Sequence, residues 1–428
     1  MDTIFAQATA AGKAGVSIIR VSGPRALEAA GLFGVRLAPI DRKVARLWDD
    51  DGALVDIALL LSFAQGHSFT GDRVVEFHTH GSRVIVARLL ALLGEAGFRQ
   101  AEPGEFTRRA LETGQLDLAQ VEGLADLIDA ETEEQRRQAV RMFDGVLGAL
   151  VEGWRTRLIR AAALLEATID FAEEEVPENV FPEVRSLLSS VHGELRQEAD
   201  GADVRERVRD GFEVAIVGPP NTGKSTLLNR LAGRDAAITS EHAGTTRDVI
   251  EVRMDLKGLP VTILDTAGLR ESQDAVEQMG IDVGRKRAGL ADLRIYLLES
   301  PEEVAEPQAA DDIVILSKAD EQSAPERPAV SGLTGEGVDA LVETVASVLA
   351  DRVRVAGAAT RARHATALRD GSVRIGQVLE RLASDDIENV DLLAEDLRAA
   401  IRALDALVGR VDVEAVLDDI FRSFCIGK

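Results

Sequence analysis

The sequence contains little cysteine, few aromatic residues and no long uncharged hydrophobic run. Cys425 is the only cysteine in 428 residues, so no disulfide can form within the chain, which favours a reducing compartment. Aromatic residues make up 4%, so the cores must consist mainly of leucine, valine, alanine and isoleucine. No apolar run of about 18 residues is present, and the first residues lack the pattern of a signal peptide. We therefore expect a bacterial-type cytoplasmic protein without a membrane span.

The net charge and the length of the chain limit its possible binding partners and its number of domains. The net charge of −24 argues against broad, non-specific binding of nucleic acid. A chain of 428 residues is expected to fold into about two to four domains. One region is locally basic, because six arginines stand against one aspartate within residues 352–374. Such a helix face is either a solvated surface or a contact for RNA, and both interpretations stay open.

Hydrophobic periodicity divides the chain into segments. Residues 1–116 predict a mixed α/β domain with a helix at 83–96 and strands at 16–21, 57–63 and 74–78. From about residue 117, apolar residues recur at helical spacing in 118–130, 132–166 and 182–207. The first part of the chain is therefore expected to be α/β, and the second part helical.

A strand–loop–helix alternation then begins at residue 212 and continues to about 349. Helices are again predicted after it, at 362–382, 390–408 and 413–424. This order predicts a nucleotide-binding α/β domain inserted into an all-α domain. The predicted boundaries are 1–116 for the N-terminal domain, 117–210 for the first helical part, 211–354 for the inserted domain and 355–428 for the second helical part.

A glycine-rich stretch near the middle of the chain is the most specific motif. It reads Gly218-Pro219-Pro220-Asn221-Thr222-Gly223-Lys224-Ser225 and matches the phosphate-loop pattern G-x-x-x-x-G-K-[ST]. An apolar run at 212–217 precedes it as a strand, and 225–232 follows as a helix with leucines on one face. Backbone N–H groups and a helix N-terminus bind anions together, so the phosphates of a nucleotide belong here.

Three further segments distinguish GTP from ATP. Asp265-Thr266-Ala267-Gly268 follows a predicted strand, where Asp265 would hold the Mg²⁺ shell and the Gly268 N–H would sense the γ-phosphate. In Ser317-Lys318-Ala319-Asp320, the carboxylate of Asp320 can accept the N1–H and 2-amino protons of guanine, while Lys318 lies across the purine. Ser331-Gly332-Leu333 is similar to the loop that offers N–H groups to guanine O6. Their order at strand ends predicts a GTPase, although Ser317 stands where Asn or Thr is usual.

The catalytic part departs from the Ras pattern. Ras-type enzymes place a Gln after D-x-x-G to orient the attacking water, whereas Leu269 stands here and cannot polarise water. Glu277 is the candidate to replace that Gln, and the alternative is a surface Glu on an acidic helix. The first switch is predicted at 243–248, whose threonines are candidates for Mg²⁺ coordination. Asn221 could bring an amide oxygen to a monovalent cation.

Further motifs lie outside the nucleotide segments, at both ends of the chain. Near the N-terminus they are Asp2-Thr3-Ile4, 15–24, Phe69-Thr70-Gly71-Asp72, 75–81 and 103–110. The chain ends in Phe424-Cys425-Ile426-Gly427-Lys428, which is similar to a C-x-G-K signature. Together with the GTPase motifs, these segments resemble the MnmE family (also called TrmE) of tRNA-modifying GTPases over the whole chain.

The resemblance implies a multidomain α/β plus α fold. An N-terminal α/β domain would bind 5-formyltetrahydrofolate or a related tetrahydrofolate, and an all-α helical domain would be interrupted by an inserted Ras-like P-loop GTPase domain. The N-terminal domain would form a constitutive homodimer, and the GTPase domains would pair in a K⁺-dependent way during GTP hydrolysis. A flavin-dependent partner, MnmG (also called GidA), would join it in a heterotetramer. Together they would add an aminomethyl or carboxymethylaminomethyl group to C5 of the wobble uridine of certain tRNAs.

By position, the resemblance also implies roles for single residues. Folate contacts are implied at Arg20, Glu76 and Lys428, and at Gln115, where the family has a Lys whose charge is lost here. Cys425 is either a small buried hydrophobe or a nucleophile beside the folate. His78 and His80 alternate on one predicted strand face, for which we expect ordinary hydrogen bonding rather than metal binding.

In the inserted domain the resemblance implies a complete nucleotide and cation site. Glu277 would position the attacking water, Ser225 and Thr246 would bind Mg²⁺, and the implied K⁺ ligands are Asn221, Ser240, His242 and Thr245. The GTP-binding set is Asn221, Thr222, Gly223, Lys224, Ser225, Thr226, Ser240, Thr245, Thr246, Asp265, Thr266, Ala267, Gly268, Ser317, Lys318, Asp320, Ser331, Gly332 and Leu333.

Two other functions compete with a tRNA-modifying GTPase. One is a regulatory GTPase switch of the Era or ribosome-assembly kind, whose attached RNA-binding module would be basic and would carry G-x-x-G or aromatic stacking motifs. None of these motifs is evident in the sequence. The other is a folate-dependent transferase with a vestigial GTPase, for which Ser317 leaves some room. GTP turnover measured with and without K⁺ separates the last possibility from the first.

Overall fold

The computed structural model describes most of the chain and forms two compact units. One unit comprises residues 1–125 with 405–428, and the other comprises 126–404. The described residues are 2–170, 180–234, 251–265, 289–303, 307, 309–322, 327–354, 357–384, 390–411, 420, 421, 424 and 427. A membrane-spanning helix, which needs both length and sustained hydrophobicity, is not found among these residues.

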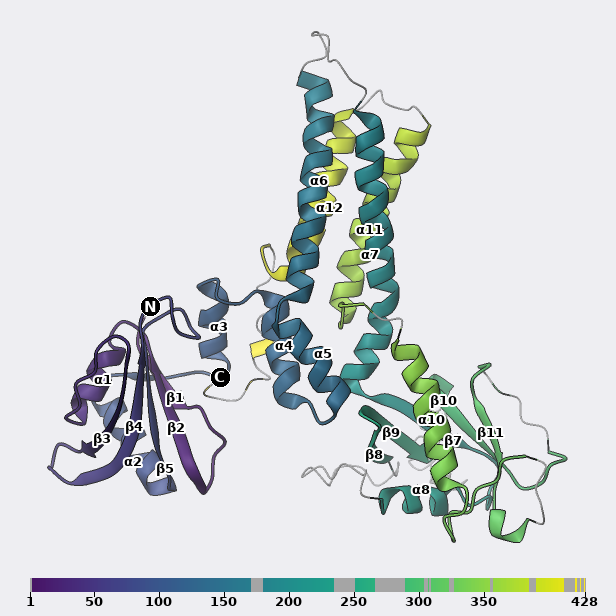
Figure 1. Ribbon diagram of the computed structural model, residues 1–428, viewed down its shortest axis with the longest axis horizontal. Helices are drawn as coiled ribbons and strands as arrows, with labels where there is room; N and C mark the ends of the chain where they lie inside the picture. The colour runs from purple at the N-terminus through teal and green to yellow at the C-terminus, as the bar shows by residue number, and fades with distance from the viewer. Residues whose placement is uncertain are drawn as a thin grey trace, which may run out of the picture. The chain divides into compact units, whose positions relative to one another are not determined.

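The first unit is built on a six-stranded sheet (Figure 1). Its order is β3-β4-β5-β2-β1-β6, antiparallel except for the pair of β1 and β6. The strands predicted at 16–21, 57–63 and 74–78 are confirmed within β2, β4 and β5. The bounds are β1 Ile4–Gln7, β2 Ala14–Ser22, β3 Asp41–Trp48, β4 Leu54–Phe63, β5 Val74–Gly81 and β6 Arg99–Gln100.

The two faces of this sheet differ in character. Helices α1 (Ala26–Leu32) and α2 (Arg83–Glu95) share a core with Ile19, Val21 and Phe77 on one face. Successive side chains of a strand alternate between faces, so Arg20, Glu76 and His78 lie on the other. This second face carries Arg20 and Glu76, two of the four residues for which a folate contact is predicted. Two further helices follow β6 in sequence, α3 Glu105–Glu112 and α4 Leu118–Asp129.

The second unit begins with two consecutive helices. α5 (Glu133–Phe143) starts at a capping box, in which Thr132 and Gln135 bind each other's backbone N–H groups. α6 (Val146–Asp170) follows Gly145, whose φ of +86° lies in the left-handed region that favours glycine. The helical spacing noted over 132–166 is therefore found in two helices, which Gly145 separates.

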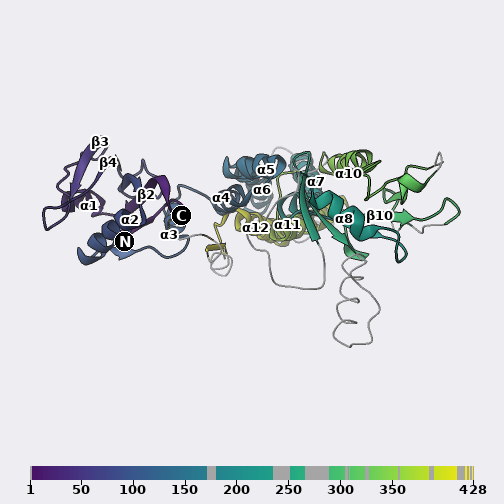
Figure 2. The ribbon, with the colours of Figure 1, turned by 90° about the horizontal axis from the view of Figure 1, so that it is seen from below.

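Three more long helices run beside α6 and complete a bundle (Figures 1 and 2). They are α7 Phe181–Asp210, α11 Ala362–Ala383 and α12 Val390–Asp405, with a short 3₁₀ turn η3 at Ala406–Val408. On α7 the fully buried side chains recur at helical spacing, at Val184, Leu188, Val191 and Leu195. α7 and α11 pack along each other although the second sheet separates them in sequence, and the Arg185 guanidinium donates to the Leu382 carbonyl.

The second sheet has five strands in the order β11-β10-β7-β9-β8. β7 (Phe212–Val217), β9 (Leu259–Asp265), β10 (Leu293–Leu298) and β11 (Ile313–Leu316) are parallel, and β8 (Glu251–Leu256) is an antiparallel edge. Leucines of α8 (Lys224–Ala232) and α10 (Val338–Val353) pack into its core. Buried parallel strands read as continuous apolar runs, which is why the strand predicted at 212–217 is confirmed with these bounds.

Candidate functional site

The phosphate loop joins β7 to α8 through a backbone that its sequence favours. Asn221 and Gly223 adopt left-handed φ values of 65° and 85°. A side chain at Gly218 would place its Cβ 2.5 Å from the Leu297 carbonyl oxygen of β10, so this close approach requires glycine. Successive N–H groups in such a loop, followed by a helix N-terminus, form a concave site for an anion.

Lys224 is the first residue of α8, and its side chain is 4% exposed. Its ammonium donates to the carbonyl oxygens of Gly218 at 2.8 Å and Pro219 at 2.6 Å. Burial lowers the pKa of Lys224, and the negative charges of Asp265 and Glu299 oppose that change. The lysine is therefore held inside the loop, where its charge can neutralise phosphate oxygens.

Ser225 and Asp265 are brought into direct contact from different elements. Ser225 is the second residue of α8, and Asp265 is the 3%-exposed last residue of β9. The Ser225 hydroxyl donates to Oδ2 of Asp265 at 2.5 Å. A hydroxyl and a carboxylate are hard oxygen donors, so this pair fits a Mg²⁺ site beside a phosphate loop.

The segment from Ser317 to Asp320 follows β11 directly. Both the N–H and the hydroxyl of Ser317 donate to the Leu298 carbonyl of β10, at 2.8 and 3.0 Å. Lys318 adopts a left-handed φ of 53°, and Asp320 lies exposed in a 3₁₀ turn, η2 (Ala319–Glu321). The Ser317 hydroxyl thus anchors the segment to the sheet, which gives a structural role to the departure from Asn or Thr.

Glu299 lies beside Lys318 and was not predicted from the sequence. Its Oε1 is 3.3 Å from the ammonium of Lys318, and it directly follows β10. A signal for Glu299 was present in the sequence. It is an acidic residue directly after a parallel strand, β10, whose neighbour β11 leads into Ser317.

The segment 331–333 lies against α8. Ser331 is buried, and its N–H donates to the Glu336 carbonyl at 2.8 Å. A Cβ on Gly332 would lie 2.6 Å from the backbone nitrogen of Leu227 and 2.7 Å from the carbonyl carbon of Thr226. Leu333 is 74% exposed. Only glycine allows the loop to approach the phosphate-loop helix so closely.

The sheet topology explains why these segments meet. β7, β9 and β11 are parallel, so the residues that follow them lie at the same edge of the sheet. The structure thereby brings together the described members of the predicted nucleotide site. Other predicted members lie outside the described residues, namely Ser240, His242, Thr245, Thr246, Thr266, Ala267, Gly268 and Glu277.

A second group of predicted residues meets on the polar face of the first sheet. Arg20 and Glu76 are cross-strand partners on β2 and β5, and the Arg20 Nε donates to Glu76 Oε1 at 2.9 Å. The guanidinium carbon of Arg20 also lies 5.7 and 5.6 Å from the ring centres of Phe69 and Phe106. A cation between two aromatic rings, paired with a carboxylate, is suited to a flat heterocycle with hydrogen-bonding edges.

Gln115, another predicted folate contact, and Gly427, which precedes Lys428 in the sequence, have close contacts within the first unit. Gln115 lies beside Gly71, since a Cβ there would be 3.3 Å from the Gln115 Cγ. Gly427, at φ +103°, packs against the Gln7 carbonyl so closely that a side chain would overlap it. Gln7 directly follows Ala6, the cross-strand partner of Arg20. Cys425 and Lys428 lie outside the described residues.

The two histidines of β5 are hydrogen-bonded to carboxylates, as expected. His78 Nε2 lies 3.2 Å from Glu76 Oε2, and His80 Nδ1 lies 2.7 Å from Asp56 Oδ1. Within the described part of the chain, no three His, Cys, Asp or Glu side chains gather in a way that could hold a metal ion.

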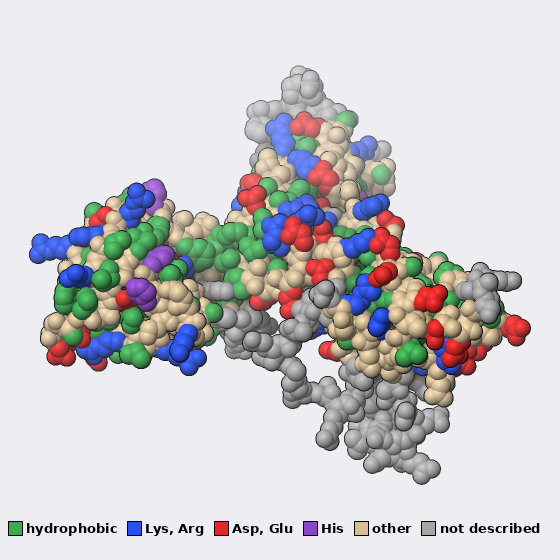
Figure 3. Space-filling view, turned by 60° about the horizontal axis from the view of Figure 1, so that its bottom comes forward, with side chains coloured by type: hydrophobic (Ala, Val, Ile, Leu, Met, Phe, Trp, Pro, Cys, Tyr) green, Lys and Arg blue, Asp and Glu red, His purple; other side chains and the backbone are tan. Residues whose placement is uncertain are grey.

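The basic region at 352–374 is largely neutralised by neighbouring acids. On the face of the second unit shown in Figure 3, Lys and Arg are interspersed with Asp and Glu. This pattern favours a solvated surface over an RNA contact. The ion pairs are Arg352 with Asp311, Arg354 with Asp351, Arg361 with Asp126, Arg369 with Asp203 and Arg374 with Asp370.

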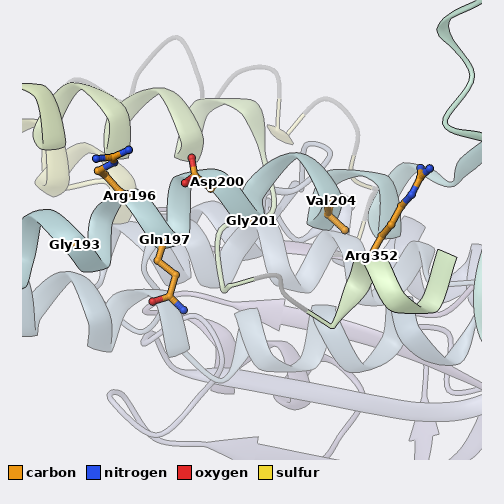
Figure 4. Close-up of a pocket in the computed structure, with 7 residues that line it drawn as sticks. All are labelled: Gly193, Arg196, Gln197, Asp200, Gly201, Val204 and Arg352. Atoms are coloured by element: carbon orange, nitrogen blue, oxygen red, sulfur yellow. The ribbon is translucent and has the colours of Figure 1, made fainter. Parts of the chain in front are cut away.

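An open groove of about 540 Å³ runs along α7 to the end of α10 (Figure 4). Its lining includes Arg196, Gln197 and Asp200 from α7 and Arg352 from α10. Arg352 also donates to the carbonyl of Asp292, which directly precedes β10. The groove therefore adjoins the amino ends of the parallel strands, at the edge opposite the phosphate loop.

Comparison with known proteins identifies two family models along the chain. The model for the GTP-binding protein TrmE N-terminus matches residues 3–115, and the model for the MnmE helical domain matches residues 118–425. The tRNA modification GTPase MnmE of Ruegeria pomeroyi is 58% identical over 433 residues, with 100% of both chains covered. The protein of the same name from Cereibacter sphaeroides is 57% identical over 431 residues, again with 100% of both chains covered.

Among solved structures, a variant of Era from Aquifex aeolicus bound to GDP.AlF4- is 27% identical. It covers 32% of this chain and 56% of its own, with a TM-score of 0.24. The family models and the full-length relatives decide the assignment. The chain belongs to the MnmE (TrmE) family of tRNA modification GTPases.

Proposed function

We propose that the chain binds and hydrolyses GTP at the carboxyl edge of the second sheet and uses this cycle in tRNA modification. The contact between Ser225 and Asp265 carries the proposal, because it joins the phosphate loop to the segment expected to respond to the γ-phosphate. Ser317 and Lys318 at the same edge supply the support for guanine recognition. The names of the full-length relatives point to the same activity.

The donor set at this edge fits the proposed cations. Ser225 would bind Mg²⁺ together with Thr246, with Asp265 supporting its water shell, and Mg²⁺ when bound neutralises charge on the β- and γ-phosphates. Asn221 is exposed at a left-handed φ within the loop, and its amide oxygen would bind the K⁺ ion. Ser240, His242 and Thr245 would complete that site.

The proposed hydrolysis relies on positioning and charge. Lys224 and the loop N–H groups hold the phosphates, and Asp320 accepts the protons of the guanine edge. Leu269 has no polar group for the attacking water, so Glu277 would orient it. The first switch, 243–248, would close on the γ-phosphate.

The polar face of the first sheet would bind 5-formyltetrahydrofolate or a related tetrahydrofolate. Arg20 and Glu76 offer a charged edge, and Phe69 and Phe106 flank the guanidinium. The contact of Gly427 with Gln7 supports the approach of Lys428 to this face. Cys425 would then act there as a nucleophile or remain a structural thiol.

The proposed assembly follows from the family. The chain would be a cytoplasmic homodimer that forms a heterotetramer with a flavin-dependent MnmG-type protein. The product would be an aminomethyl or carboxymethylaminomethyl group at C5 of the wobble uridine of certain tRNAs. The contact of α7 with α11 supports a GTPase domain at 211–354 inserted between helical parts at 117–210 and 355–428, behind a domain at 1–116.

GTP turnover in KCl and in NaCl tests the nucleotide part of this proposal. We expect faster turnover in KCl and loss of GTP binding in Lys224→Ala. Lys257→Ala is the matched control, because Lys257, in the β8–β9 turn, pairs with the exposed Glu343 of α10. Glu277→Ala should keep GTP affinity and slow hydrolysis. Unchanged GTP affinity of Lys224→Ala would refute the phosphate-loop assignment.

The modification state of wobble uridines tests the tRNA part. A strain that lacks this gene should lose the C5 group, and the wild-type gene should restore it. Restoration should fail with Lys224→Ala. Fully modified tRNA in the deletion strain, despite active GTP hydrolysis by the purified protein, would instead favour a regulatory switch of the Era kind.

A further inference from the structure

The loop that follows the strand bridge at Ala329 forms a closed turn around Ser331. The Ser331 hydroxyl accepts the N–H of Thr334 at 3.1 Å, and its carbonyl accepts the N–H of Gly335 at 2.9 Å. The Ser331 N–H donates to the Glu336 carbonyl at 2.8 Å. Because three hydrogen bonds centre on one residue, this loop should move as one piece.

The loop touches α8 in two places. Near the start of α8, Gly332 packs against the backbone of Thr226 and Leu227. Near its end, the Arg230 guanidinium donates to the Thr334 carbonyl at 3.0 Å. The same guanidinium fills the space that a side chain on Gly335 would occupy, with Nε 2.9 Å from that Cβ position. Arg230 thus contacts the loop through a hydrogen bond and through the Nε edge of its guanidinium.

α8 is also the helix that begins at the phosphate loop. Arg230 lies six positions after Lys224, which corresponds to about 9 Å of helix. One rigid helix therefore carries the phosphate-binding lysine at one end and holds the loop for the guanine edge from the other. The position of that loop relative to the phosphates depends on its attachment to α8.

We infer that Arg230 is a positioning residue for guanine recognition. It touches no part of the nucleotide in this role, but fixes the loop whose remaining N–H groups, those of Gly332 and Leu333, would face guanine O6. The inference rests on the proposed GTP site. It assigns a role to a residue outside the predicted set, and the flat guanidinium is what allows one side chain to bind a carbonyl and cover a glycine.

This role predicts how the replacement of Arg230 should change the affinity for different nucleotides. O6 is common to guanine and hypoxanthine, whereas the 2-amino group, which Asp320 would bind, is present only in guanine. Arg230→Ala should therefore weaken the binding of GDP and of IDP by the same factor, so that the ratio of the two dissociation constants is unchanged. Loss of one hydrogen bond and its packing predicts a factor of about five. The KM for GTP should rise by a similar factor with kcat unchanged, because the loop does not reach the γ-phosphate.

Calorimetric titration of the full chain with GDP and IDP provides the test, with steady-state GTP hydrolysis beside it. Arg230→Lys should recover part of the affinity, since an ammonium can bind the Thr334 carbonyl but cannot cover Gly335. Arg234→Ala is the matched control, because Arg234 pairs with Asp339 of α10 at 2.6 Å rather than with the loop. The control should bind both nucleotides like wild type.

Wild-type affinity of Arg230→Ala for GDP would overturn the inference, provided that Lys224→Ala loses binding. Unequal loss of GDP and IDP, an equal loss in Arg234→Ala, or a lowered midpoint of thermal unfolding without nucleotide would also overturn it. Failure of the wild-type protein to bind GDP would be a different result, because it would refute the GTP site itself.

Discussion

The carboxylate of Glu194 should stabilise the helical bundle, and the structure allows the size of the effect to be worked out. Glu194 of α7 accepts two hydrogen bonds of 2.6 Å from the Arg157 guanidinium of α6. It also accepts the indole N–H of Trp154 at 2.8 Å and the hydroxyl of Ser190 at 3.0 Å. The bonds from Arg157 lower the pKa of Glu194 from 4.5 to about 2, with burial opposing them and Trp154 and Ser190 assisting.

This pKa difference sets the upper limit of the stabilisation. A fall from 4.5 to about 2 corresponds to about 3 kcal/mol in favour of the folded, ionised state. The side chain of Glu194 is 40% exposed, so solvent screens the pair and we expect about 1 kcal/mol. Because the folded pKa is depressed, the contribution is fully present above about pH 4.5 and is lost as the pH falls towards about 2.

Urea unfolding of Glu194→Gln measures this contribution. Trp154 is fully buried and reports on the bundle, and a Trp48→Phe background leaves it as the only tryptophan. We expect Glu194→Gln to unfold with about 1 kcal/mol less free energy at about pH 6, and the difference from wild type to shrink at about pH 3.

Glu183→Gln is the matched control, because Glu183 joins the same two helices through one bond to Arg160 and is 51% exposed. This control should lose less than about 0.5 kcal/mol. An equal loss in both variants, or a difference between wild type and Glu194→Gln that does not change with pH, would refute the reasoning.

Three further predictions concern the proposed sites. In Gly427→Ala the new Cβ would overlap the Gln7 carbonyl, so the contact between the C-terminal end and Gln7 should be lost. Thiol modification of Cys425 should then accelerate about tenfold, and an unchanged rate would contradict this contact. Asp320→Asn should weaken the binding of GDP about a hundredfold and favour xanthosine diphosphate (XDP), because an amide can donate to the 2-carbonyl of xanthine. Retained GDP affinity in a titration would exclude Asp320 from the site. Arg20→Ala should weaken the binding of 5-formyltetrahydrofolate about tenfold, measured by calorimetry, and leave GTP turnover unchanged. A folate affinity equal to that of wild type would count against that site.

Local patterns in the sequence were sufficient for many elements. The apolar run 212–217 is β7, because a strand buried on both faces leaves little room for another interpretation. β3 (Asp41–Trp48) was not predicted, since its charged and exposed residues show no strong alternation, and its pairing with β4 defines it as a strand. The helical spacing over 132–166 did not show that two helices share this segment, since the left-handed Gly145 ends one helix before the next begins.

The chemistry of the nucleotide site was readable from the sequence because each motif is short. The phosphate loop, Asp265 and Ser317 to Asp320 each carry their functional groups within a few residues, so order and spacing were enough to propose GTP. Motif content of this kind does not depend on how distant segments meet. The family match over the whole chain agrees with that reading.

The tertiary structure alone decided which distant groups touch. Arg230 and Thr334 are separated by 104 positions, and Ser225 and Asp265 by 40. Both contacts arise because the carboxyl ends of the parallel strands lie at one edge of the second sheet. At this edge α8 and the loop at 331–335 can pack together. No local periodicity encodes such a meeting, since it depends on the order of the strands in the sheet and on where glycine permits two backbones to approach.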